Sequence, residues 1–506
     1  MRKRQYTRYF SIYILLVSFF WISIIYSEED RLIKIGSKKF TESVILGEIA
    51  TQMGKNISEK VIHIKELGGT RILWNSLLRA DIDIYPEYTG TIIQEILAEH
   101  HIQGEIELEK TLKSFGIQMS KPLGFNNTYA LGMKRDLAEK LDLKNISDLK
   151  RYPDLKFGLT NEFLDRGDGW PHLKKHYNLP QDNVRGLDHD LAYRGLESDA
   201  IDIIDLYSTD AEIEYYDLKV LSDDQKFFTD YKAVLLYRSD LQKHNPRVLK
   251  NILKLEDTIN EFIMIEMNGQ VKLYGLSEKQ VAGEFLKRYF NIVSPIQQDT
   301  FLKRLMSTTI DHLILVLISL TAAILISIPL GILSFHHKKA GQIILGITGI
   351  FQTIPSLALL VFMIPLLGIG AKPAIFALFL YSLLPIIRNT YSGLSDIPNS
   401  IRESSVVLGI STITRLRRIE IPLATRSILA GIKTSAVINI GTATLGALIG
   451  AGGYGQPILT GIRLDNTTLI LEGAIPAACL ALIAQGLFDL LELIIVPKGL
   501  RIGSEA

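Results

Sequence analysis

Long stretches without a charged side chain dominate the C-terminal part of the chain, whereas most charged residues precede Arg304. About 20 apolar residues in a helix span the hydrocarbon core of a bilayer, so these stretches predict membrane-spanning helices. The stretches are residues 313–335, 340–371, 373–387, 434–462 and 473–488. The second is long enough to tilt or to include a re-entrant piece, and the third is short for a straight span. We predict an all-α transmembrane domain over residues 304–497, with five helices at about 313–335, 342–367, 371–388, 428–450 and 470–496.

The region from residue 31 to residue 295 has a different pattern. Short β-like runs such as LIKIGS, KVIHIKEL, KFGLT and AVLLYR alternate with amphipathic stretches such as SVILGEIATQMG and RILWNSLLRA. This alternation favours an α/β fold with a mainly parallel sheet. Its length suits two lobes with a cleft between them.

The N-terminus combines a basic start with residues 9–26, a run without charge. Such a segment is either a secretory signal or a retained anchor. The run is about long enough to span a bilayer, and the following IIYSEEDR lacks a small-x-small cleavage pattern. We therefore expect residues 1–30 to be a membrane anchor or an uncleaved signal, and residues 31–295 to be an extracytoplasmic domain.

The positions of Lys and Arg predict how the spans are oriented, because cytoplasmic loops are enriched in these residues. Residues 336–339 and the C-terminal Lys498 and Arg501 are expected inside, and the glycine-rich loop 450–466 outside. The loop 388–426 is expected inside because it carries six arginines, namely Arg388, Arg402, Arg415, Arg417, Arg418 and Arg426. Five spans enclose too little surface for a transport path, so we expect a homodimer.

Composition argues against several other functions. A net charge of +1 gives no reason to expect nucleic-acid binding, and the single cysteine, Cys479, cannot form a disulfide within the chain. The ten histidines lack ligand-like spacing, so no metal site is expected. Neither a G-x-x-x-x-G-K-[ST] phosphate loop nor a G-x-S-x-G elbow occurs. We expect a non-enzymatic chain without a cofactor of its own.

The predicted cytoplasmic loop contains a spaced motif. Residues 402–422 read RESSVVLGISTITRLRRIEIP, with Glu403-Ser404-Ser405, then Gly409 and then Ile419-x-Ile421-Pro422. The spacing resembles the "EAA" loop of ABC importer permeases, with serines in place of both alanines and Ile421 in place of a leucine. The resemblance implies a helix-turn-helix that docks on an ATPase subunit, present in two copies and using ATP and Mg. It assigns the coupling positions to Glu403, Gly409 and Pro422.

Several motifs of the exported domain resemble the substrate-binding proteins of glycine betaine/carnitine/choline importers. They are GSKKFTESVILGEI, DIDIYPEYTGT, PLGFNNTYAL, EFLDRGDGWPHLKKHY and DLYSTDAEI. In the permease half, IFQTIPSLALL and GAGGYGQPILTGIR resemble the cognate membrane subunit. The resemblance implies a two-lobed α/β periplasmic-binding-protein-like domain (type II) fused to an ABC type-1 permease. The binding domain comes first here, whereas fusions with the permease first are more usual.

The resemblance also implies a pocket in which aromatic rings surround a trimethylammonium group, which ring faces attract. The matching positions are Tyr88, Tyr129, Tyr207 and Tyr231, with Tyr85 as an alternative to Tyr88. The ligand carboxylate would be met by Lys39, Thr91 and Asn127. A cation at position 39 would favour a zwitterion over choline, although a solvated surface lysine is an equal alternative. Arg166 and Asp168 either bind ligand or close their own loop.

Together these expectations describe a subunit of an ATP-driven importer for quaternary ammonium osmoprotectants in a bacterial inner (plasma) membrane. The chain would combine substrate binding and permeation. An ergothioneine importer of the same family is the alternative. From another class, a ligand-gated channel or sensor would use the same binding fold.

Overall fold

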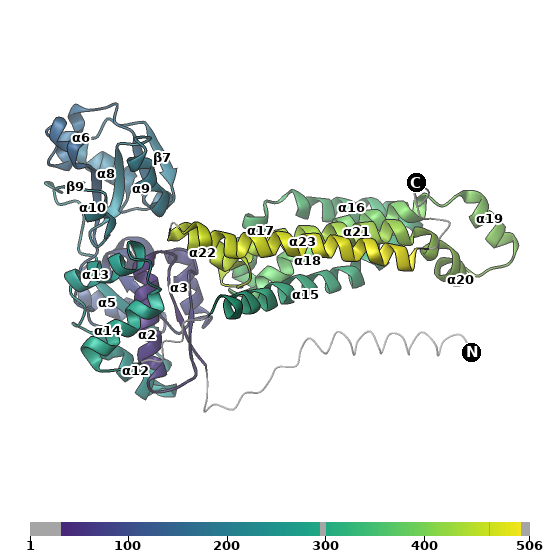
Figure 1. Cartoon of the computed structure of the whole chain (residues 1–506), viewed down its shortest axis with the longest axis horizontal. Coiled ribbons are helices and arrows are strands. Elements are labelled where there is room, and N and C mark those ends of the chain that lie inside the picture. Colours follow the sequence, from purple (N-terminus) through teal and green to yellow (C-terminus); the bar gives the residue numbers. More distant parts are fainter. Residues whose placement is uncertain (1–31, 294–299, 465, 497–506) are drawn as a thin grey trace.

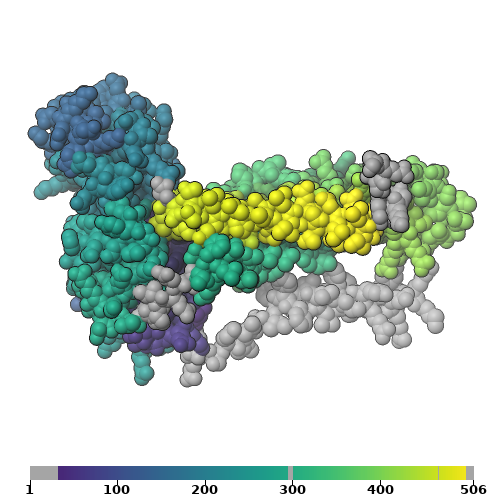
Figure 2. Space-filling model, viewed as in Figure 1, coloured from purple at the N-terminus to yellow at the C-terminus, as the bar shows by residue number. Residues whose placement is uncertain are grey.

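The computed structural model describes residues 32–293, 300–464 and 466–496. An α/β head lies at one end of a long bundle of helices (Figure 1; Figure 2). The head itself consists of two lobes, each built on a five-stranded sheet. The predicted N-terminal anchor, residues 1–30, lies outside the described residues.

Lobe 1 holds the sheet β2-β1-β3-β10-β4. Its strands are β1 (Ile33–Gly36), β2 (Val61–Ile64), β3 (Ile84–Tyr88), β4 (Ile117–Met119) and β10 (Ala233–Arg238). Its helices are α2 (Thr41–Lys55), α3 (Thr70–Leu78), α4 (Thr89–Thr91), α5 (Glu105–Ser114), α11 (Leu241–His244), α12 (Pro246–Ile252), α13 (Glu261–Lys272) and α14 (Glu278–Phe290). Helix α2 is buried along almost its whole length because it packs on the sheet and on α12, α13 and α14.

Lobe 2 holds the sheet β7-β6-β8-β5-β9. Its strands are β5 (Tyr129–Lys134), β6 (Phe157–Thr160), β7 (Val184–Leu187), β8 (Ile203–Tyr207) and β9 (Leu218–Leu221). Its helices are α6 (Arg135–Lys140), α7 (Asn161–Asp165), α8 (Trp170–Tyr177), α9 (His189–Glu197) and α10 (Glu212–Tyr215). The buried, mostly apolar strands Phe157–Thr160 and Ile203–Tyr207 form the centre of this sheet.

The chain crosses between the lobes twice, before β5 and before β10. These two strands pair antiparallel with their neighbours, whereas β1 pairs parallel with β2 and β3, and β6 with β7 and β8. Each sheet is therefore mixed rather than mainly parallel, because the crossing strands enter against the direction of the others. Asn126 and Lys232, on the two crossings, pair with each other. This pairing places a double-stranded connection at the junction of the lobes.

The bundle contains four helices long and apolar enough to cross a membrane, or five if one bent pair forms a single span, among the residues described. The long helices are α15 (Phe301–His336), α18 (Ala371–Ser395), α21 (Ile421–Thr442) and α23 (Thr467–Ile495). The bent pair is α16 (Lys338–Thr353) and α17 (Ser356–Leu367), and the chain bends by 101° between them. The bend follows from Pro355, because a residue before proline prefers an extended backbone, as Ile354 adopts here.

Shorter elements lie at the two ends of the bundle. Near the head, a tight helical turn, Ala443–Ile449, leads to α22 (Gly455–Arg463). At the far end, α19 (Asn399–Val407) and α20 (Thr412–Arg415) precede the turn Leu416–Glu420 (Figure 1). The head contacts the bundle through lobe 1: Arg79 donates a hydrogen bond to the carbonyl of Ile364 in α17. The loop 402–422 therefore lies at the opposite end of the bundle from the head.

Candidate functional site

Aromatic rings from both lobes meet where the strands end at the junction of the lobes. Tyr88 ends β3, Tyr129 begins β5 and Tyr207 ends β8, while Tyr231 lies just before β10. The ring centres of Tyr129 and Tyr207 are 5.0 Å apart, and those of Tyr129 and Tyr231 are 5.8 Å apart. Phe40, which precedes α2, lies next to Tyr207 and Tyr88, with its ring centre 5.5 Å from that of Tyr207 and 6.2 Å from that of Tyr88. The four tyrosines named by the motifs thus form one group with Phe40, which we call the aromatic cluster.

Tyr85, the alternative to Tyr88, occupies a different place. Its side chain is fully buried in the core of lobe 1, in a separate hydrophobic cluster from that of Tyr88. The two residues are three positions apart on strand β3, so they point to opposite faces of the sheet. The structure therefore places Tyr88, and not Tyr85, in the aromatic cluster.

A guanidinium group lies against the aromatic cluster. The Arg166 side chain is buried and lies 5.4 Å from the ring centre of Tyr129. It donates hydrogen bonds to Asp168 and, at 3.4 Å, to the hydroxyl of Thr91 across the interlobe junction. Asp168 in turn accepts from the Tyr231 hydroxyl. Burial alone would raise the pKa of Asp168, but the hydrogen bond and charge of Arg166 lower it.

Two adjacent lysines in the first motif have different surroundings. Lys38 is buried, pairs with Glu87 and lies 5.5 Å from the ring centre of Tyr88. The Lys39 side chain is 51% exposed and makes one long ion pair, 3.3 Å, with Asp188 of lobe 2. Lys39 thus lies at the rim of the junction, whereas Lys38 is the cation turned toward the rings. The adjacent pair in the sequence does not reveal which lysine turns inward.

Glu42 is a buried carboxylate that the sequence analysis did not assign to the site. It accepts hydrogen bonds from the side chains of Tyr88, Asn127, Thr209 and Asn268. The pKa of Glu42 is raised above its ordinary value, because the effect of burial exceeds the opposing effect of these hydrogen bonds. Because the donors come from both lobes, Glu42 ties the lobes together beneath the aromatic cluster. Glu42 lies in the first turn of α2, where an acidic residue is ordinary, so its place in the sequence does not distinguish it.

Asn127 and Thr91, the other positions expected to meet a carboxylate, are both buried. The Asn127 amide donates to Glu42 at 2.8 Å, and its own Oδ1 has no hydrogen-bond partner among the residues that the structure describes. Thr91 accepts from Arg166. The structure therefore separates the two: Thr91 contacts the cation beside Tyr129, and Asn127 belongs to the Glu42 network.

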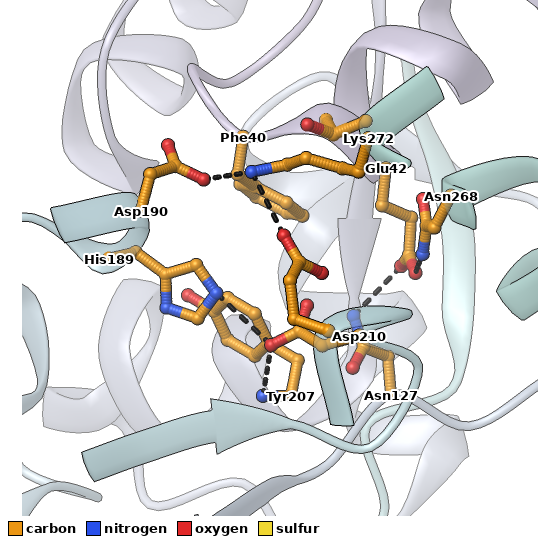
Figure 3. Close-up of a pocket in the computed structure, with 11 residues that line it drawn as sticks. Phe40, Glu42, Asn127, His189, Asp190, Tyr207, Asp210, Asn268 and Lys272 are labelled. Atoms are coloured by element: carbon orange, nitrogen blue, oxygen red, sulfur yellow. Dashed lines mark hydrogen bonds and ion pairs between the residues drawn. The ribbon is translucent and has the colours of Figure 1, made fainter. Parts of the chain in front are cut away.

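Small cavities remain beside the aromatic cluster. One, of about 10 Å³, lies between Phe40, Tyr207 and the polar residues Glu42, His189 and Lys272 (Figure 3). A second, of about 40 Å³, reaches from Phe40 toward Lys39, Asp188 and Glu162. The first holds about one water molecule. A trimethylammonium compound therefore requires the lobes to separate or the rings to turn.

His189 contacts the back of the cluster, with its ring centre 4.7 Å from that of Tyr207. Its Nε2 lies 3.1 Å from Asp210, which also accepts from the Tyr207 backbone N–H (Figure 3). Asp210 accepts from the Tyr193 hydroxyl as well. Burial alone would lower the pKa of His189, but the Asp210 carboxylate raises it to about 9. The imidazole is thus a cation near neutral pH.

The loop at the far end of the bundle is a helix-turn-helix. Glu403 is exposed on α19, and Gly409 turns the chain toward α20 with a φ of +73°. Pro422 lies at the start of α21. Glu420, almost fully buried, lies 3.5 Å from Arg402 and 3.3 Å from Arg415, so it draws both arms of the loop together. The three expected coupling positions therefore occupy one compact loop.

Comparison with known families identifies both parts. Residues 31–288 match the substrate-binding domain of ABC-type glycine betaine transport systems. Residues 313–498 match the inner membrane component of binding-protein-dependent transport systems. The chain belongs to the ABC-type glycine betaine transporter family. It is a substrate-binding domain joined to an ABC permease, as the motifs predicted, and both parts are transport components rather than enzymes.

Individual relatives of this transporter chain match different portions of it. The glycine betaine/carnitine/choline permease protein OpuCB of Bacillus subtilis is 42% identical over 209 residues, which cover 40% of this chain and 96% of the relative. The ergothioneine transport permease/binding protein EgtU of Helicobacter pylori is 33% identical over 296 residues, covering 57% of this chain and 53% of that relative. A crystal structure of a glycine betaine/carnitine/choline ABC transporter is 30% identical and covers 51% of this chain and 98% of its own, with a TM-score of 0.44.

Proposed function

We propose that the head of this transporter chain captures a zwitterion with a trimethylammonium group and a carboxylate, of the glycine betaine type. The observation that supports this most is the aromatic cluster with the Arg166 guanidinium beside Tyr129. Ring faces attract a quaternary ammonium group, which cannot donate conventional hydrogen bonds. Arg166 and Thr91 supply donors for a carboxylate next to those rings.

The carboxylate is part of the proposal for an electrostatic reason. Arg166 is buried beside Tyr129, and although Asp168 pairs with it, a ligand carrying only positive charge still brings a second cation to one group of rings without a carboxylate of its own. A ligand carboxylate pairs with the guanidinium and removes that repulsion. Choline lacks the carboxylate and should bind less tightly than glycine betaine. Lys39 is half exposed at the rim of the junction, where its charge would attract an anionic group of the ligand before the ligand enters.

Ergothioneine is the second candidate ligand. It carries the same trimethylammonium and carboxylate groups, and the relationship to EgtU favours it. The cavity of about 40 Å³ toward Glu162 and Asp188 lies where additional ligand atoms would extend beyond the rings. The family relationship favours a transporter over the ligand-gated channel considered from the sequence.

Transport itself is proposed to need partners. The permease would form a homodimer in a bacterial plasma membrane, and two ATPase subunits would dock on the loop that contains Glu403 and Gly409. Apolar side chains exposed on this loop support such a docking surface, and they include Val406, Val407, Leu408 and Ile413. The placement of Lys and Arg supports an orientation with the loop in the cytoplasm and the head outside.

Isothermal titration of the full-length chain in nanodiscs tests the ligand class. The panel is glycine betaine, carnitine, proline betaine, ergothioneine and choline. We expect at least one carboxylated trimethylammonium compound to bind, and choline to bind more weakly than that compound. If no member binds, the aromatic cluster is not a quaternary ammonium site. If choline binds as tightly as the best zwitterion, the role given to Arg166 is wrong.

A further inference from the structure

A buried ammonium group connects three parts of the molecule. Lys272, the last residue of α13 in lobe 1, has its Nζ in contact with Asp190 and, at 3.2 Å, with Glu212. The same nitrogen lies 3.1 Å from the backbone carbonyl oxygen of Arg463, the last residue of α22 in the permease. Asp190 and Glu212 both belong to lobe 2, and Figure 3 shows the Lys272 side chain reaching toward Asp190.

The number of contacts matches the chemistry of the group. An ammonium has three N–H donors and no acceptor; here Nζ donates hydrogen bonds to Asp190 and to the Arg463 carbonyl oxygen, and it forms an ion pair with Glu212. The Lys272 side chain is only 12% exposed. A buried cation that loses a partner is costly, because desolvation of the charge is then not compensated. Lys272 is therefore fully satisfied only when both lobe 2 and the permease are in place.

The side chain of Arg463 anchors the same residue to lobe 1. The Arg463 guanidinium is buried and pairs with Glu66 at 2.7 Å and with Glu278, and it donates to the hydroxyl of Thr41 at 3.1 Å. All three partners belong to lobe 1. Burial alone would raise the pKa of Glu278, but the charge of Arg463 lowers it to about 2. The end of α22 is therefore fixed to lobe 1 while its carbonyl faces Lys272.

We propose that Lys272 couples closure of the two lobes to docking of the head on the permease. When the lobes separate, Asp190 and Glu212 move away from the ammonium and leave it with the Arg463 carbonyl. When the head leaves the permease, that carbonyl is withdrawn and the ammonium loses an acceptor. A buried Lys272 ammonium that lacks the Arg463 carbonyl is less stable in the closed head, and one that lacks Asp190 and Glu212 is less stable in the docked head. Docking of the head therefore favours closed lobes.

Such coupling is reciprocal by thermodynamic necessity. If docking through Arg463 favours closure by a given factor, closure favours docking by the same factor. Coupling between sites typically corresponds to about 5- to 150-fold. The outer end of the permease would then respond to whether the lobes are closed, because α22 packs on both α23 and the turn Ala443–Ile449.

The test measures the distance between the lobes in the full chain without any ligand, so its outcome does not depend on the ligand class proposed above. Spin labels are placed at two exposed positions, Lys140→Cys in lobe 2 and Lys287→Cys in lobe 1, after Cys479→Ser. Double electron–electron resonance then gives the populations of closed and open lobes. We expect a measurable closed population in the otherwise unaltered chain. Arg463→Gln and Lys272→Met should each raise the ratio of open to closed lobes by about fivefold or more.

The double variant Arg463→Gln with Lys272→Met should open the lobes no further than Lys272→Met alone, because one path carries both effects. The matched control is Arg151→Gln, which removes an exposed ion pair with Asp148 within lobe 2 and leaves the contacts between the head and the permease in place. It should leave the lobe populations unchanged. If Arg463→Gln cannot be measured because it unfolds, Glu66→Gln replaces it under the same criterion, since Glu66 pairs with the same guanidinium.

Three results would overturn the proposal. The first is a permease-side variant with lobe populations like those of the unaltered chain, which would make Lys272 a bridge between the lobes alone. The second is an additive double variant. The third is an unaltered chain without any closed population.

Discussion

The guanidinium of Arg166 lies 5.4 Å from the ring centre of Tyr129, so a cation of the protein itself faces a ring that the motifs assign to a ligand cation. The two residues sit on different elements of lobe 2, with Tyr129 at the start of β5 and Arg166 directly after α7. Arg166 also reaches Thr91 of lobe 1. This arrangement links selection of the ligand charge to contact between the lobes.

Arg166→Met should weaken binding of glycine betaine about 10- to 150-fold, because a hydrogen bond to a charged group contributes about 1.5–3 kcal/mol. The affinity for choline should stay the same or rise, because the variant lacks the cation that repels it. Isothermal titration of the full chain with both ligands gives the ratio. Arg166→Lys keeps the charge without the planar guanidinium, so its affinity for glycine betaine should lie between those of the unaltered chain and Arg166→Met.

A result in which Arg166→Met loses glycine betaine and choline to the same extent would contradict this role. It would indicate that Arg166 acts only by closing its loop through Asp168, the alternative left open by the sequence. Thermal unfolding of the variant separates a folding defect from a change in selectivity.

Tyr129→Ala should reduce affinity for a trimethylammonium ligand about 30-fold or more, because a desolvated cation–π contact contributes about 2 kcal/mol. Tyr129→Phe keeps the ring face and should stay within a few-fold of the original affinity. Tyr274→Ala, at an exposed tyrosine that is not part of the aromatic cluster, serves as the control. Equal affinities of Tyr129→Ala and Tyr129→Phe for every ligand would show that the ring face does not bind the cation.

Motifs assigned four tyrosines to one pocket, and the structure brings these residues together because each lies at or next to the end of a strand, and strand ends meet at the junction of the lobes. The same motifs could not distinguish Lys38 from Lys39. Adjacent side chains point in opposite directions, and the direction here depends on pairing of Lys38 with Glu87, a residue 49 positions away. Glu42 was missed for a related reason: its donors come from distant segments, including Thr209 and Asn268.

In the membrane part, runs of uncharged residues located the helices but not their ends. Helix α15 begins at Phe301, ahead of the uncharged run. The prediction missed its first turns because they carry charged residues such as Lys303 and Arg304, which hydropathy excludes from a span. The predicted helix 342–367 is broken at Pro355. Hydropathy reports burial in an apolar phase, whereas breaks and caps depend on backbone preferences of single residues.

The stability of the head should fall as pH rises through about 9 because of His189. Its pKa is raised from 6.5 to about 9 by Asp210, so folding binds a proton, and the stabilisation is full below about 6.5 and lost as pH rises through 9. At about 1.4 kcal/mol per unit of pKa, the effect is about 3 kcal/mol. Thermal unfolding of the full chain and of His189→Gln, from pH 6 to pH 10, should show curves that converge at high pH.

Asp210→Asn removes the main charge that raises the pKa of His189 and should reduce the same pH dependence. Other acidic groups near the imidazole, Asp190 and Asp205, also raise its pKa and remain in that variant, so a smaller dependence is expected to persist. A constant difference between His189→Gln and the unaltered chain across this range would show that the imidazole is not charged in the folded head.

Gly409→Ala should separate ligand binding from transport. Gly409 has a φ of +73°, and an L-residue in this left-handed region costs about 1 kcal/mol or more, so alanine would shift the turn between α19 and α20. Apart from its chain neighbours, no heavy atom of the described residues would lie within 4 Å of an added Cβ at this position, so the strain comes from the backbone alone. Glycine betaine binding to the head, at the far end of the bundle, should be unchanged, whereas ligand-stimulated ATP hydrolysis by a reconstituted ATPase partner should fall.

Gly346→Ala is the matched control, because it also has open space around it but lies within α16 at a helical φ. Loss of coupling in both variants, or in neither, would contradict the role assigned to the turn.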